Sequence, residues 1–166
     1  MTVPPLPKVA HISITNGGTL AWSIQFSQTV EPILAGVIYE ISFDAYASKN
    51  VQIYCDLNQA GGDYQGILPP SYESPMFDIT TTITTFYRSV LCIIDDDDGD
   101  YSQLQFNLGG LGSYDIYLDN ISLTADGDEQ IINGDFSSPI TEGWNDLLLL
   151  EGGVATVTIM TPPPDE

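Results

Sequence analysis

The sequence predicts an all-β protein built as a two-sheet antiparallel β-sandwich. Apolar and polar residues alternate along several short segments, and clusters of glycine, proline, asparagine and aspartate separate these segments. No segment shows a convincing apolar stripe of an amphipathic helix. Successive side chains of a strand point to opposite faces, so strict alternation indicates a strand with one buried face. Many short strands with regular turns are typical of a sandwich or a barrel.

The alternation is clearest in four segments, where every second residue is apolar and the residues between are polar. We expect strands over residues 39–45, 51–57, 103–108 and 154–159. The separating clusters include Asn16-Gly17-Gly18 and Asp126-Gly127-Asp128, which are turn formers.

The length of 166 residues suits one domain with a two-layer core. We expect this domain over residues 9–159. Proline cannot donate to a strand ladder, so the Pro-rich segments 1–8 and 160–166, the second of them also acidic, are expected to be extended tails.

The chain is strongly acidic, with 3 Lys+Arg against 23 Asp+Glu and a formal net charge of -20. Such a surface repels phosphate backbones and anionic lipids, so nucleic acid and membrane partners are not expected. The charge either favours bound cations such as calcium or serves solubility in a salty medium.

Neither an N-terminal signal peptide nor a membrane span is visible, and the apolar run 147–150 is far too short to cross a bilayer. The expectation is a piece of a longer secreted protein or a product released without secretion, such as a virion component. The location would accordingly be extracellular or on a virion surface.

Cys55 and Cys92 either form one disulfide or remain buried thiols.

Several segments together resemble the carbohydrate-binding modules of the family 4/9 type, which are jelly-roll sandwiches. The matching segments are residues 9–14, 16–19, 22–25, 36–45, 104–110 and 116–123. The resemblance implies the same jelly-roll fold and a capacity to bind glycans.

The chain departs from this family in the order of its segments. Asn133-Gly134-Asp135-Phe136, followed by Gly143-Trp144, resembles the family's opening segment but comes after its closing strand. The domain therefore looks circularly permuted, which costs little when the chain ends lie close together. The last segment, 131–159, either completes its own sandwich or adds a strand to a neighbouring subunit, which would build a homo-oligomer.

Sugar rings offer apolar C–H patches and hydroxyl groups, so they bind flat aromatic rings and planar amides. Such side chains are expected on outward strand positions and in one glycine-rich loop. The candidate glycan-binding residues are Gln25, Tyr46, Gln52, Tyr54, Tyr64, Gln103, Gln105 and Asn107. Similar residues are also routine on solvent-facing sheets, and core packing is the expected role of Trp22 and Trp144.

The resemblance also implies a structural calcium ion where the opening turn meets the closing strand. Here its ligands would be Asp119, Asn133 and Asp135, completed by backbone carbonyls. The acidic run 95–100 lacks the EF-hand spacing, and we interpret it as a solvated loop.

No catalytic motif is found. The chain has one histidine, His11, at an outward strand position, and no nucleophile elbow, Walker loop or zinc pattern. We therefore expect a non-catalytic module for a β-glucan or a related polysaccharide, carried on a larger assembly. The alternative is a structural subunit, such as a virion decoration or capsid-cement protein, that contacts neighbouring capsid or assembly subunits.

Overall fold

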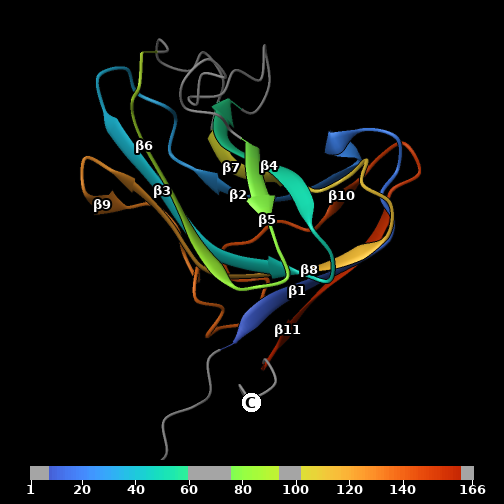
Figure 1. Ribbon diagram of the computed structural model, residues 1–166. Helices are drawn as coiled ribbons and strands as arrows, with labels where there is room; N and C mark the ends of the chain where they lie inside the picture. Colours follow the sequence, from blue (N-terminus) through green and yellow to red (C-terminus); the bar gives the residue numbers. More distant parts are fainter. Residues whose placement is uncertain (1–7, 60–75, 94–101, 162–166) are drawn as a thin grey trace, which may run out of the picture.

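The computed structural model describes residues 8–59, 76–93 and 102–161, and the strands of these residues form two antiparallel sheets that pack face to face (Figure 1). The predicted sandwich is therefore confirmed. Both predicted tails, except Lys8, Met160 and Thr161, lie outside the described residues, as do Tyr64 and the acidic run 95–100.

The first sheet contains six strands in the order β11-β1-β8-β3-β6, with β9 paired to β8. The strands of this sheet are β11 (Val154–Met160), β1 (Val9–Asn16), β8 (Tyr114–Ala125), β3 (Ile38–Ala47), β6 (Thr84–Leu91) and β9 (Asp128–Glu129).

The second sheet contains five strands in the order β10-β2-β7-β4-β5. The strands of this sheet are β10 (Leu148–Leu149), β2 (Ile24–Val30), β7 (Ser102–Asn107), β4 (Val51–Gln59) and β5 (Met76–Ile79). A short 3-10 helix, η1 (Ala21–Ser23), precedes β2. No helix among the described residues is long and apolar enough to cross a membrane.

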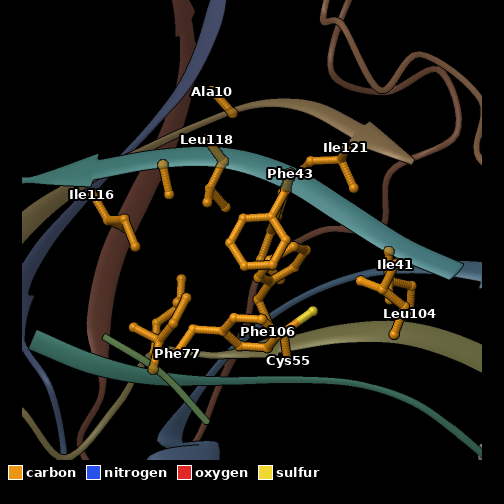
Figure 2. Packing of buried hydrophobic residues seen from close by; sticks show 14 of the residues in the cluster. Ala10, Ile41, Phe43, Cys55, Phe77, Leu104, Phe106, Ile116, Leu118 and Ile121 are labelled. Atoms are coloured by element: carbon orange, nitrogen blue, oxygen red, sulfur yellow. The ribbon is translucent and has the colours of Figure 1, made fainter. Parts of the chain in front are cut away.

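The core lies between the two sheets and is rich in aromatic rings. Phe43 of the first sheet meets Phe77 and Phe106 of the second at centroid distances of 5.0 and 5.1 Å, both edge-to-face (Figure 2). All three side chains are at most 1% exposed. Edge-to-face contacts are a favoured arrangement of aromatic pairs, so this cluster joins the two layers.

The two cysteines belong to this core and form no disulfide with each other. Cys55 and Cys92 are 0% and 2% exposed. Burial raises the pKa of the Cys55 thiol, because an apolar interior disfavours the thiolate. Of the two alternatives left open by the sequence, the structure selects buried thiols.

The last segment closes the sandwich within its own chain. β11 pairs antiparallel with β1 from Val9↔Met160 to Asn16↔Val154, and β10 pairs with β2. The first of the two placements predicted for residues 131–159 is thus the one observed.

The turn between β9 and β10 is fastened to the sandwich by a bulge in β8. The register between β3 and β8 shifts beside Asn120, whose φ of 48° is left-handed. The next amide, that of Ile121, donates to the Gly134 carbonyl at 2.9 Å. Bulges commonly redirect backbone groups in this way. The turn then places Phe136 and Trp144 in the core, with the Trp144 ring stacked on Phe26 at 4.5 Å.

Candidate functional site

The outer side of the five-stranded sheet carries a concentration of amide side chains. We call this surface the amide face and define it by Gln25, Gln52, Tyr54, Asp56, Asn58, Gln103, Gln105 and Asn107. These residues alternate along β2, β4 and β7 with core residues such as Phe26, Cys55 and Phe106. The alternation that builds the core therefore also builds this polar surface.

Strand register aligns one row of outward side chains across the whole sheet. Leu148 lies opposite Gln25, Gln25 opposite Asn107, Asn107 opposite Tyr54, and Tyr54 opposite Met76. Because neighbouring strands lie about 4.8 Å apart, a row of five spans roughly 19 Å. That length suits an extended oligomeric ligand better than a single small molecule.

The amide side chains on β4 and β7 form a hydrogen-bonded network. Gln103 Nε2 donates to Gln105 Oε1 at 2.6 Å, and Gln105 Nε2 donates to Asn107 Oδ1 at 2.6 Å. Asn58 Nδ2 also donates to Gln105 Oε1, at 3.2 Å. Each amide is held by its neighbour, so the network is preorganised before any ligand arrives.

The network leaves donors and acceptors unused at its two ends. The two bonds along β7 run in one sense, so that, among the described residues, the Asn107 NH₂ group and the Gln103 carbonyl oxygen have no hydrogen-bond partner. Asn58, which is 5% exposed, has a buried Oδ1 with no hydrogen-bond partner in the described part of the chain. A buried acceptor without a partner costs free energy, and this oxygen is enclosed by the protein rather than offered to a ligand.

Tyr54 lies in the middle of the row. Its hydroxyl donates to Asp56 Oδ2 at 3.4 Å, and Asp56 Oδ1 accepts the Leu57 amide at 2.8 Å. Burial, followed by the nearby Asp56 carboxylate, raises the pKa of Tyr54, since both disfavour the phenolate. The phenol therefore stays neutral at physiological pH.

Positive charge is absent from the strands of the amide face. The three basic residues of the chain are Lys8, Lys49 and Arg88. Lys8 precedes β1, and Lys49 lies between β3 and β4, where it donates to the Leu111 carbonyl. Arg88 stands on β6, with its guanidinium over the Phe77 ring at 4.3 Å. Arg88 reaches this sheet only at its β5 edge, where Nη2 donates to the Met76 carbonyl at 3.4 Å, so an anionic ligand would find no lysine or arginine on the strands of the amide face.

Six of the eight predicted glycan-binding residues share the amide face, namely Gln25, Gln52, Tyr54, Gln103, Gln105 and Asn107. Their role as ligand contacts stays a prediction. Gln105 points outward as expected but is only 7% exposed, because its amide is enclosed in the network. It supports its neighbours rather than offering a free side chain. Tyr64 lies outside the described residues.

Tyr46, another of the predicted residues, does not share the amide face. Tyr46 points outward from β3, which belongs to the six-stranded sheet. Its ring stacks on Tyr117 at 4.5 Å, and Tyr117 stacks on His11 at 4.6 Å. His11 Nε2 bonds Asp115 Oδ1 at 2.9 Å. Alternation predicts that a side chain faces outward, but not which of the two sheets carries it.

The expected core role is wrong for Trp22. Its side chain is 50% exposed, whereas Trp144 is 5% exposed and packs in the core as predicted. Trp22 lies on η1, outside the strand, so strand alternation does not place it. Sequence reasoning also missed Asn58, which one further step of the alternation in β4 after Asp56 would have found.

The predicted calcium ligands fit a metal ion only in part. Asn133 Oδ1 accepts the Ser138 amide at 3.0 Å, and its Nδ2 donates to the Ser138 and Pro139 carbonyls. That side chain therefore organises its own turn. Among the described residues, no group of three His, Cys, Asp or Glu side chains lies close enough to hold a metal. Only Asp119 and Asp135 suit a hard cation, and the calcium site stays a prediction.

Asp119 has a pKa of about 6, raised mainly by desolvation and further by the carboxylates of Asp44 and Asp135. The native state therefore holds this proton up to a higher pH than the unfolded chain does. Stability falls as pH rises from the ordinary value of 3.8 to about 6, and the loss persists above that range. In EDTA, Asp119→Asn should stabilise the protein at pH 7 by on the order of 1 kcal/mol after solvent screening.

Thermal unfolding at pH 7 and at pH 3.5 checks this expectation. The gain from Asp119→Asn should vanish at pH 3.5, where the wild-type side chain is protonated. Repeating the scans in calcium tests the cation. A bound ion should raise the melting temperature of the wild type but not of Asp119→Asn. Equal stability of both proteins at both pH values would contradict the assigned ionisation.

Comparison with solved structures identifies the class of fold as that of carbohydrate-binding modules. A module described as PbXyn10C CBM in its apo form is similar over 98% of this chain and 94% of its own, with a TM-score of 0.75 and 23% identity. A structure described as "CBM4 structure and function" is similar over 70% of each chain, with a TM-score of 0.59 and 27% identity.

The second N-terminal cellulose-binding domain of β-1,4-glucanase C from Cellulomonas fimi gives a TM-score of 0.57 at 23% identity, over 70% of this chain and 75% of its own. The chain thus has a fold like that of the family 4 carbohydrate-binding modules, which confirms the resemblance. No protein-family model matches the sequence, and no match is found among curated proteins.

Proposed function

We propose that the protein is a non-catalytic module that binds a neutral polysaccharide, of the β-glucan or a related class, along the amide face. The observation that carries this proposal is the amide network of β4 and β7, in which contacts among the described residues leave the Asn107 NH₂ group and the Gln103 carbonyl oxygen available at the two ends. A sugar hydroxyl group both donates and accepts, so one ligand type satisfies both ends.

Charge narrows the class of polysaccharide. A uronic acid or a sulfated sugar would bring anions to a sheet that has no lysine or arginine on its strands and carries Asp56 and Asp78. The net charge of -20 adds long-range repulsion. A neutral chain meets neither penalty. The fold shared with carbohydrate-binding modules supports the same class of ligand.

The affinity should be modest. An open sheet surface leaves water at its rim, and binding must order a flexible chain. Both effects favour dissociation constants of about 10⁻³–10⁻⁶ M.

The proposed function includes an extracellular location, because polymeric glycans occur outside the cell. The segment that suggested the assembly alternative pairs within its own chain, so no described feature favours that alternative.

Affinity electrophoresis in native gels tests the proposal. The gels contain hydroxyethylcellulose, xylan, laminarin or carboxymethylcellulose. We expect at least one neutral polymer to retard the protein and carboxymethylcellulose, which places anions on a cellulose backbone, to leave its mobility unchanged. Tyr46→Ala, altered on the opposite sheet, should be retarded like the wild type. Unchanged mobility in every neutral polymer would refute glycan binding, and retardation by carboxymethylcellulose would refute the charge argument.

A further inference from the structure

The side chain of Trp22 is half exposed on a turn that is firmly held. Within and around η1, the Ala21 carbonyl accepts the Gly109 amide at 2.8 Å, and the Ser23 carbonyl accepts the Leu150 amide at 2.8 Å. The Ser23 amide donates to the Leu20 carbonyl at 2.9 Å, and the Leu20 amide donates to Ser23 Oγ at 3.1 Å. These bonds fix the backbone of the turn internally and from two separate segments.

Close backbone packing holds the same turn. A Cβ atom added to Gly109 would lie 2.5 Å from the Leu20 carbonyl oxygen, so the β7–β8 loop touches η1 directly. On the other side, a Cβ atom on Gly153 would lie 2.5 Å from the Ser23 carbonyl oxygen. Only glycines allow these approaches. The turn is therefore a rigid support, and the exposure of Trp22 is not due to a loose loop.

The turn lies beside the amide face. Gln25, which belongs to that face, donates through Nε2 to the Trp22 carbonyl at 3.0 Å. Across the strand from Gln25 stands Leu148 of β10, which is 48% exposed and ends the outward row. Figure 1 shows η1 next to β10 at this edge of the five-stranded sheet. Trp22 thus lies just before the start of β2, next to Gln25 of the amide face.

A half-exposed indole on a rigid turn next to a polar surface suits one kind of contact. The C–H face of a pyranose packs against a flat aromatic ring, while its hydroxyl groups project sideways to polar partners. Little backbone entropy is lost on binding, because the turn beneath the ring is already fixed.

We propose that Trp22 is a stacking platform that extends the glycan-binding surface beyond the amide face, past the start of β2. The ligand would be a neutral polysaccharide chain long enough to lie on the indole and on the amide network together. This inference rests on the proposed function, and it assigns Trp22 as a residue that sets affinity for long chains.

Intrinsic fluorescence tests the assignment directly, since Trp22 and Trp144 are the only tryptophans of the chain. Hydroxyethylcellulose should shift the emission of the wild type and protect it from quenching by acrylamide. In Trp22→Phe this response should disappear, because Trp144 is buried. In native gels, Trp22→Ala should weaken retardation by hydroxyethylcellulose by about tenfold in affinity, which corresponds to about 1.4 kcal/mol.

Tyr87→Ala provides a matched control, because Tyr87 is 52% exposed on β6 of the other sheet. The retardation of Tyr87→Ala should equal that of the wild type. Circular dichroism should show that Tyr87→Ala and Trp22→Ala are both folded. If the wild type binds hydroxyethylcellulose and Trp22→Ala binds it equally well, the platform is refuted and the proposed function stands. If no neutral polymer retards the wild type, both proposals fail.

Discussion

Gly134→Ala should destabilise the protein by about 3 kcal/mol, among the larger effects of a single substitution. A Cβ atom at this position would lie 2.0 Å from the Ile121 carbonyl oxygen, far inside contact distance. The turn would have to move, and the bond from the Ile121 amide to the Gly134 carbonyl would be strained or lost. Movement would also disturb the buried Phe136 and Trp144. For a domain of this size the melting temperature should fall by roughly 10 °C.

Gly127→Ala is the appropriate comparison. Gly127 has a φ of +90°, but nothing lies within 4 Å of its added Cβ atom. Only backbone strain applies there, and the expected cost is about 1 kcal/mol. Differential scanning calorimetry of both variants separates the two causes. Equal losses would show that close contact with Ile121 is not what requires glycine at position 134.

Gln105→Leu should lower affinity for the neutral polymer about tenfold or more, while the protein remains folded. The Gln105 amide accepts bonds from Asn58 and Gln103 and donates to Asn107. Leucine has a similar size but removes all three bonds, so the outer amides lose their fixed orientation. Leaving polar groups buried without partners should also cost about 1–3 kcal/mol of stability.

Gln52→Leu is the matched control on the same face. Gln52 is exposed and donates to Asp78 Oδ1 at 3.0 Å, outside the network. The free energy of unfolding of the Gln52→Leu variant should differ from that of the wild type by less than about 0.5 kcal/mol. Urea unfolding and affinity electrophoresis on both variants give the comparison. Normal binding by Gln105→Leu would remove the network from the proposed mechanism.

The fold could be predicted from the sequence because alternation records burial directly. The segment 39–45 falls within β3, and 154–159 falls within β11. The same periodicity identified Gln105 and Asn107 as outward-facing. It could not identify the burial of Gln105, which depends on side chains of neighbouring strands that meet only in the folded sheet.

The alternation of apolar and polar residues could not show which of the two sheets each strand joins. Tyr46 and Tyr54 occupy equivalent outward positions on consecutive strands, yet β3 and β4 belong to different sheets. The chain crosses between layers at the turn after Ala47, and a period-2 pattern carries no sign of that crossing. The exposure of Trp22 could not be predicted for another reason. Contacts with two glycines that are distant in the sequence hold η1 in place, and these contacts form only in the folded protein.

The pairing of Val9 with Met160 brings the first and last described strands to one point on the six-stranded sheet. Chain attached at either end would leave the molecule from the layer opposite the amide face. The module can therefore be spliced into a surface loop of a host protein almost as readily as it can be joined end to end. In either arrangement the host and the bound polymer would lie on opposite sides, and neither would obstruct the other.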